Sequence, residues 1–207
     1  MRSTPFTSSR FQYSQLKFSN SPQPFRAVPD TGSADLWIDN TKFDRGASST
    51  FKQVGGPATI SYRSGSVTGD VAEDVVTFGG FSVSTQRFLL GAATPNAPVD
   101  PNNGNIGLPA PDATSPFGAT PFWSAVRKND PTIDSQMSFK FPPAPGGSRE
   151  TREVEHNEPS GGVLTVGGVN ASLFTGNVEF CPLVTFGGLR THWALPVSGL
   201  YPICARN

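Results

Sequence analysis

Short apolar runs, broken at close intervals by turn-forming residues, constrain the fold of this chain more than any other feature. From Phe11 to about Leu90, runs rich in Val, Phe, Thr and Ile are separated by Gly, Ser, Asn and Pro. The 207 residues include 22 glycines and 20 prolines, well above average usage. This pattern predicts short strands and turns rather than long helices. We therefore expect an all-β fold.

Several of these runs are spaced as β-hairpins. Two candidate hairpins pair residues 58–62 with 67–71, and residues 74–78 with 81–84. Residues 63–66 form the turn of the first, and Gly79 and Gly80 can take the positive φ values that a tight turn needs in the second. We expect an antiparallel meander here. Three further strands are expected at residues 162–169, 177–180 and 193–197.

Helix is scarce, and the best candidate spans residues 120–128. Thr120 can cap it, Pro121 suits its first turn, and two cations lie near its C-terminal end. Residues 94–121 contain much Pro, Asn, Ala and Gly, so we expect most of them to form surface loop. The charge-dense stretch 142–160 is predicted to be an exposed loop or insertion.

The balance of charge excludes several classes of partner. Lysines and arginines number 16, as do the acidic residues, so no net field draws the chain to nucleic acid or to an anionic membrane. No stretch approaches the roughly 20 apolar residues that span a bilayer, and the first residues lack the apolar run of a signal peptide. We expect neither a nucleic-acid nor a membrane partner.

The few cysteines and histidines provide no metal or cofactor site. Cys181 and Cys204 are the only cysteines, and the sequence leaves open whether they pair or are buried as free thiols. His156 and His192 lack acidic or cysteine neighbours at metal-ligand spacing, so we expect no metal and no cofactor. Asn170 begins an Asn-Ala-Ser triplet and is a candidate glycosylation site.

One short motif carries recognisable chemistry. Asp30-Thr31-Gly32-Ser33 is followed closely by Leu36-Trp37. This segment resembles the first active-site segment of the pepsin-like aspartic proteases, which is Asp-Thr-Gly-Ser followed by a Leu-Trp pair. The tripeptide alone is weak evidence, so agreement elsewhere along the chain decides its meaning.

The resemblance continues in order and spacing over most of residues 13–200. Matching landmarks are the Ser-Ser-Thr-aromatic stretch at 48–51, the flap hairpin at 60–69, the strand pair at 74–88, the apolar-Gly element at 104–108, the Gly-Gly region at 161–168, the aromatic-Thr-Gly at 174–176 and Trp193. The resemblance implies a pepsin-like acid-protease fold. In that fold residues 11–172 form the N-terminal catalytic lobe with the central-sheet strands, and residues 173–207 begin an incomplete C-terminal lobe.

The resemblance also implies roles for individual side chains. Asp30 is the catalytic carboxylate, and the residues that support its loop are Thr31, Gly32 and Ser33. The flap and substrate-binding residues are Tyr62, Ser64, Gly65, Ser66 and Trp37, with the Trp37 indole N–H supporting Tyr62. Another explanation of Tyr62 and Trp37 is that both aromatic rings simply pack under a hairpin. The family further implies a polypeptide substrate, a monomer, no cofactor, and an extracellular, vacuolar or other secretory location.

The printed sequence contains no second Asp-Thr-Gly or Asp-Ser-Gly triplet. Hydrolysis in this family uses two carboxyls, one accepting a proton from water while its protonated partner polarises the scissile carbonyl. We therefore expect a C-terminally incomplete member, weakly active or inactive alone. The alternatives are a non-catalytic peptide-binding pseudo-protease and a dimer in which each chain donates Asp30, although the pepsin-like arrangement argues against the dimer.

Three positions depart from the family pattern. Pro29 replaces an apolar strand residue and removes one backbone donor. Arg63 stands where the flap usually has glycine. Asn105 replaces an apolar side chain and would bury an amide that needs hydrogen-bond partners.

Overall fold

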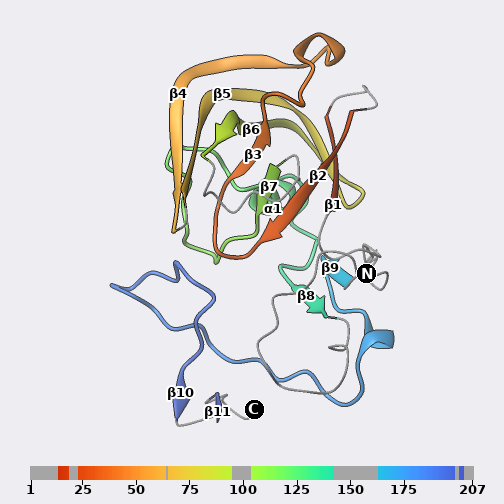
Figure 1. Cartoon of the computed structure of the whole chain (residues 1–207). Helices are drawn as coiled ribbons and strands as arrows, with labels where there is room; N and C mark the ends of the chain where they lie inside the picture. The colour runs from red at the N-terminus through yellow and green to blue at the C-terminus, as the bar shows by residue number, and fades with distance from the viewer. Residues whose placement is uncertain are drawn as a thin grey trace, which may run out of the picture.

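The computed structural model of the chain describes residues 14–18, 23–63, 65–94, 104–141, 163–198 and 201–202 (Figure 1). Its strands are β1 (Ser14–Phe18), β2 (Gln23–Asp30), β3 (Leu36–Asp39), β4 (Lys52–Tyr62), β5 (Gly65–Phe78), β6 (Phe81–Ala93), β7 (Gly104–Gly107), β8 (Met137–Lys140), β9 (Val163–Val166), β10 (Val197–Ser198) and β11 (Tyr201–Pro202). The helices are α1 (Phe122–Asn129) and the 3₁₀ turns η1 (Arg45–Ala47) and η2 (Ala171–Leu173). In the described residues no helix is long and apolar enough to cross a membrane.

Seven strands form one sheet, in the order β1-β2-β7-β3-β6-β5-β4. Because β1 also pairs with β5, six of them close into a barrel, and β4 is left on the outside of β5 (Figure 1). Closure leaves few unpaired strand edges. The expected all-β fold is confirmed.

Both predicted hairpins form. β4 pairs with β5 up to Tyr62 opposite Gly65, and β5 pairs with β6 up to Phe78 opposite Phe81. Gly79 and Gly80 take positive φ values of 61° and 78°, as the second turn requires. The first turn is tighter than predicted, because pairing draws Gly65 into β5.

Aromatic side chains fill the larger of two hydrophobic clusters. Phe18 is fully buried, and its ring centroid lies 5.2 Å from those of Phe25 and Phe43 and 5.0 Å from that of Phe88. Such edge-on and tilted pairs each add about 0.5–1.5 kcal/mol beyond the burial of their area. A smaller cluster under the β4–β5 hairpin comprises Trp37, Ile60, Val67, Val71 and Leu89, with Tyr62 packed against it.

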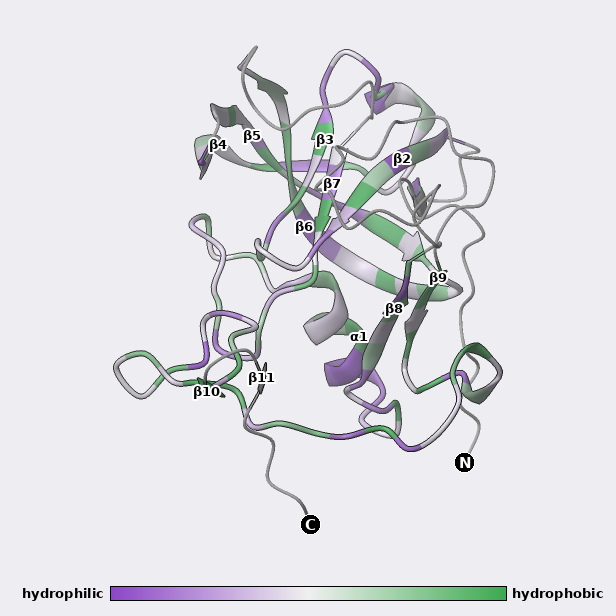
Figure 2. Ribbon diagram, turned by 60° about the horizontal axis from the view of Figure 1, so that its bottom comes forward, coloured by the Kyte–Doolittle hydropathy of each residue, from purple (hydrophilic) through white to green (hydrophobic). Residues whose placement is uncertain are grey.

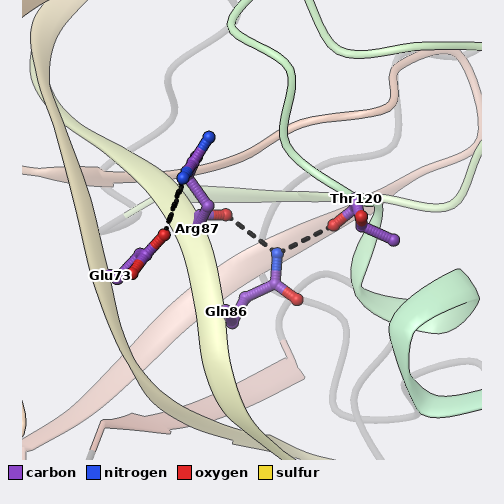
Figure 3. A network of polar contacts seen from close by, with 4 residues as sticks. All are labelled: Glu73, Gln86, Arg87 and Thr120. Carbon is purple, nitrogen blue, oxygen red and sulfur yellow. Dashed lines mark hydrogen bonds and ion pairs between the residues drawn. The ribbon is translucent and has the colours of Figure 1, made fainter. Parts of the chain in front are cut away.

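The predicted helix is confirmed as α1, with one correction at its start. Its apolar face buries Phe122, Trp123 and Val126 beneath the sheet, beside β8 and β9 (Figure 2). Pro121, and not Thr120, takes the N-cap position, with no side-chain cap. The Thr120 carbonyl instead accepts a hydrogen bond from Nε2 of Gln86, which also donates to the carbonyl of Arg87 (Figure 3).

Figure 3 also shows the cross-strand pair between β5 and β6. Arg87 donates through Nε and Nη2 to Oε1 of Glu73, at 3.1 and 2.8 Å. Gln86 is 2% exposed, so its bond to Thr120 fixes the start of α1 against a buried strand. The network therefore ties the helix to the barrel wall.

Other local predictions were wrong. Residues 104–107 form the fully buried strand β7 rather than loop, because strands on both sides supply its hydrogen bonds. No strand forms at 177–180, and β10 begins only at Val197, since these residues find no neighbouring strand among those described. β9 ends at Val166 and pairs with β8, which was not predicted. The predicted loop at 142–160 lies outside the described residues.

Candidate active site

Three strands bring the Asp30 motif together with distant residues. β7 lies between β2, to which it runs parallel, and β3, to which it runs antiparallel. This register sets Asp30 beside Gly107 and Trp37 beside Asn105. A Cβ on Gly107 would lie 2.5 Å from the Asp35 nitrogen, so only glycine allows the loop after Asp30 to pack this closely on β7.

Pro29 lies in β2 where this strand pairs with β7. Among the described residues the β1–β2 pairing runs as far as Ala27, and Pro29 stands opposite Ile106 of β7. Proline lacks the N–H that other strand residues can donate. The β2–β7 register continues through Pro29 to Asp30, so the departure from the family pattern does not break the pairing that positions Asp30.

The carboxylate of Asp30 is held at both oxygens. The backbone N–H of Gly32 donates to Oδ1 at 2.8 Å, and Nδ2 of Asn105 donates to Oδ2 at 3.2 Å. The same Nδ2 donates to Oγ of Ser33 at 3.1 Å. Ser33 was predicted to support the Asp30 loop, and among the described residues Asn105 bridges the side chains of Ser33 and Asp30.

Asn105 is a candidate site residue to which the sequence assigned no role. It is 8% exposed, and its buried amide finds both of its acceptors in the Asp30 loop. The sequence did indicate that this amide, at a position expected to be buried, needs hydrogen-bond partners. The partner could not be named, because 75 residues separate Asn105 from Asp30 and only the β2–β7 pairing joins them.

The remaining predicted site residues lie around this carboxylate or on the hairpin above it. Thr31 and Gly32 are exposed in the turn after β2, and Gly65 and Ser66 begin β5 at the hairpin tip. Ser66 is tied to Thr94, since its N–H donates to Oγ1 at 3.1 Å. Ser64 lies outside the described residues.

Tyr62 and Trp37 meet beneath the hairpin. Both rings belong to the smaller hydrophobic cluster, so packing accounts for part of their role. Neither the Tyr62 hydroxyl nor the Trp37 indole N–H makes a hydrogen bond of good geometry within the part of the chain that is described. The Trp37 side chain nevertheless lies close enough to lower the pKa of the Tyr62 hydroxyl, so the support of Tyr62 by that N–H stays a prediction. Both polar atoms are buried and remain available to a water or ligand.

Burial raises the pKa of the Tyr62 hydroxyl well above its usual range, and the charges of Asp35 and Asp30 raise it further. The nearby Trp37 and Asn105 side chains lower the pKa by less. Tyr62 therefore keeps its proton at any physiological pH and can serve as a hydrogen-bond donor above the site.

Asp35 is an unexpected buried acid next to the site. It is 4% exposed, and its Oδ1 has no hydrogen-bond partner among the described residues. Burial raises the pKa of its carboxyl, and a hydrogen bond from Ser115 partly offsets the rise. No role for Asp35 was predicted, because it lies between two landmarks of the motif.

Two pockets open on either side of the hairpin tip. The first, about 380 Å³, is lined by Asp30, Trp37, Tyr62, Arg63 and Asn105, together with neighbouring residues of β2. The second, about 470 Å³, is lined by the Thr31–Asp35 loop, the end of β4, Arg63 and Thr191. Within the described residues no group of three or more His, Cys, Asp or Glu side chains could hold a metal ion.

Similarity to known proteins identifies the family of the chain. The sequence model of the eukaryotic aspartyl proteases matches residues 12–201. The chain belongs to the eukaryotic aspartyl protease family. Its closed barrel with a hairpin beside the Asp-Thr-Gly-Ser loop is a pepsin-like lobe.

Curated aspartyl proteases match the chain at modest identity. The vacuolar aspartic protease of Candida albicans is 25% identical over 91% of this chain and 44% of its own length. Pepsin A of Rhinolophus ferrumequinum is 28% identical over 86% and 45%. Phytepsin of Hordeum vulgare is 29% identical over 84% and 35%. The chain thus spans less than half the length of these aspartyl proteases.

The candidate glycosylation site, the cysteines and the histidines lie away from the aspartyl protease motif. Asn170 caps η2, its Oδ1 accepting from the N–H of Ser172 at 3.0 Å and from its hydroxyl at 2.7 Å. Cys181 is disulfide-bonded, and Cys204, the one other cysteine, lies outside the described residues. His192 is exposed and its Nδ1 contacts the Thr191 hydroxyl at 2.9 Å, while His156 lies outside the described residues.

Proposed function

We propose that this chain supplies one half of an aspartic endopeptidase site, in which Asp30 activates the water that attacks a peptide bond. The observation that carries the proposal is the anchoring of Asp30 by Gly32 and Asn105 at the edge of a pocket roofed by Tyr62. Membership of the eukaryotic aspartyl protease family supports it. Polypeptides are then the substrates.

The proposed reaction needs two carboxyls. Asp30 accepts a proton as the water oxygen bonds to the scissile carbonyl carbon, and a protonated partner donates to the carbonyl oxygen. Asp30 then passes its proton to the leaving nitrogen as the C–N bond breaks, and the partner takes a proton back from a hydroxyl of the tetrahedral intermediate as the new carboxyl group forms. Two acids sharing one proton is the established arrangement of aspartic proteases, and the 207-residue sequence holds one Asp-Thr-Gly motif.

Each remaining prediction for the site fits this proposal. Thr31, Gly32 and Ser33 support the loop of Asp30. Tyr62, Ser64, Gly65 and Ser66 act as the flap, and Trp37 of β3 lies beneath it as a further substrate-binding residue. Residues 11–172 are the catalytic lobe and residues 173–207 the start of a second one. The name of the Candida relative supports a vacuolar or other secretory location.

The test compares the wild-type chain with Asp30→Asn, which keeps the shape of the side chain and removes its charge. We expect the chain alone to cleave labelled peptides poorly at acidic pH, because loss of one acid-base partner costs about 10²–10⁴-fold. A separately produced lobe bearing the second Asp motif of a relative is then added. We expect cleavage to rise with wild type only, and to be sensitive to pepstatin.

Two results would contradict the proposal. Robust pepstatin-sensitive cleavage by the purified monomer would remove the need for a second carboxyl. Equal cleavage by wild type and Asp30→Asn after the second lobe is added would remove Asp30 from the chemistry. Peptide binding that survives Asp30→Ala without cleavage under either condition would favour the peptide-binding pseudo-protease.

A further inference from the structure

Arg63 occupies the tip of the flap hairpin, between the last residue of β4 and the first of β5. It lines both pockets, and among the described residues it is the only basic side chain that lines either one. Its side chain is exposed, so a bound peptide can contact its guanidinium.

The guanidinium of Arg63 is free of ion pairs with the described residues. Three other arginines form ion pairs with carboxylates: Arg45 with Asp70 at 3.3 Å, Arg87 with Glu73 at 2.8 Å and Arg190 with Asp112 at 2.9 Å. Among the described residues Arg63 therefore carries a positive charge that no carboxylate pairs with. A charge in this position discriminates among ligands by sign.

The second pocket suits an acidic group better than the first. Six serine and threonine side chains line it: Thr31, Ser33, Thr59, Ser61, Thr114 and Thr191. Hydroxyls can donate to a carboxylate. In the first pocket, by contrast, the carboxylate of Asp30 would repel a second negative charge.

The one acid that lines the second pocket opposes a bound carboxylate only weakly. Asp35 is 4% exposed, whereas the side chain of Arg63 is exposed, so a ligand that enters this pocket meets the guanidinium and not the carboxyl. Arg63 therefore outweighs it as the dominant charge facing this pocket.

We propose that Arg63 is a specificity-determining residue that selects a glutamate or aspartate side chain of the peptide bound in the second pocket. The carboxylate pairs with the guanidinium and accepts from the surrounding hydroxyls. The inference rests on the proposed function for its peptide ligand, and it adds a substrate class that the Asp30 motif does not specify.

The test measures peptide binding, not cleavage. Fluorescently labelled octapeptide libraries carry Glu, Gln or Lys at one fixed position and random residues elsewhere, and fluorescence anisotropy gives Kd at about pH 6, where glutamate is ionised. The proteins are wild type, Arg63→Gln and Arg63→Glu. Arg45→Gln is the matched control, because Arg45 is also an exposed arginine but lines neither pocket.

We expect wild type and Arg45→Gln to prefer Glu over Gln by about twofold to fivefold, the upper part of the range for an exposed ion pair. Added salt should weaken this preference. Arg63→Gln should abolish it, and Arg63→Glu should shift it to Lys. A Glu preference that survives Arg63→Gln, or wild type without a Glu preference or without measurable binding, would overturn the inference.

Cleavage assays separate this inference from the proposed function. If the preference for Glu depends on Arg63 but no cleavage depends on Asp30, the inference about Arg63 stands and the endopeptidase proposal fails. Asp30-dependent cleavage with no effect of Arg63 on Glu preference would do the reverse.

Discussion

Replacing Asp35 by asparagine should stabilise this protein at neutral pH. Asp35 is 4% exposed, and its Oδ1 has no partner among the described residues, so the folded state carries a desolvated carboxylate oxygen. A buried polar atom left unsatisfied costs about 1–3 kcal/mol, and more when it is charged. Asparagine keeps the shape, removes the charge and can still accept from Ser115, while its NH2 group takes the unpartnered position of Oδ1. We expect a net gain of about 1 kcal/mol in the free energy of unfolding, because burying a charge costs more than burying an unpaired neutral amide.

The gain should depend on pH with a defined sign. Burial raises the folded-state pKa of Asp35 above its ordinary value of 3.8. Between pH 3.8 and the folded pKa, the native state binds more protons than the unfolded state, so wild-type stability falls as pH rises through this window. Below the window Asp35 is neutral in both states and the penalty disappears. The gain from Asp35→Asn should therefore shrink in acid.

Urea unfolding followed by tryptophan fluorescence, at about pH 7 and about pH 3, measures both quantities. The control is Asp112→Asn. Arg190 hydrogen-bonds to Asp112 and lowers the pKa of that carboxyl, so its stabilisation is present above pH 3.8 and is lost as pH falls. Asp112→Asn should therefore destabilise at neutral pH and not in acid.

A second measurement follows the Tyr62 hydroxyl. The charge of Asp35 contributes to the raised pKa of Tyr62. Asp35→Asn should lower that pKa, which an alkaline titration of tyrosinate absorbance detects. The reasoning is refuted if Asp35→Asn leaves stability unchanged at neutral pH, or if it gives the same gain in acid, because a change of shape rather than of charge would then be responsible.

Two further predictions concern the rest of the lobe. Asp74 is 1% exposed and accepts from the hydroxyls of Ser48 and Thr50, so Asp74→Ala should lower the free energy of unfolding by about 3–5 kcal/mol in urea titrations, with a smaller loss for the exposed Asp130→Ala. A comparable effect of the two substitutions would contradict this. Limited chymotrypsin digestion read by mass spectrometry should cut within residues 169–197 first, because Phe180 is 65% exposed and Phe186 is 55% exposed there. Equal resistance of that segment and residues 23–94 would count against it.

The parts of the fold that sequence predicted are those with local causes. The two hairpins follow from apolar runs with glycine turns between neighbouring segments, and α1 follows from one apolar face after Pro121. The failures depend on distant partners. β7 is a strand only because β2 and β3 enclose it, whereas residues 177–180 have strand composition but no described neighbour to pair with. Register across the barrel therefore decides what composition leaves open.

The candidate site likewise contains residues that local patterns reveal and residues whose roles depend on distant contacts. The Asp-Thr-Gly-Ser motif and Tyr62 could be found because each belongs to a short contiguous pattern. Asn105 and Asp35 could not be assigned roles, since the first meets Asp30 across a parallel strand pair and the second acts through burial. Arg63 was visible only as a departure from the flap pattern. Its significance comes from the pockets on both sides of it.

The groups that orient Asp30 all belong to this lobe. They are both donors to its side chain and the Leu108 N–H, which donates to its carbonyl at 2.7 Å. These donors lie in or just after strands β2 and β7, and both strands belong to the closed barrel. A partner lobe therefore needs only to place one carboxyl opposite Asp30, not to build its support. Addition of such a lobe in trans is for this reason a fair test of the chemistry.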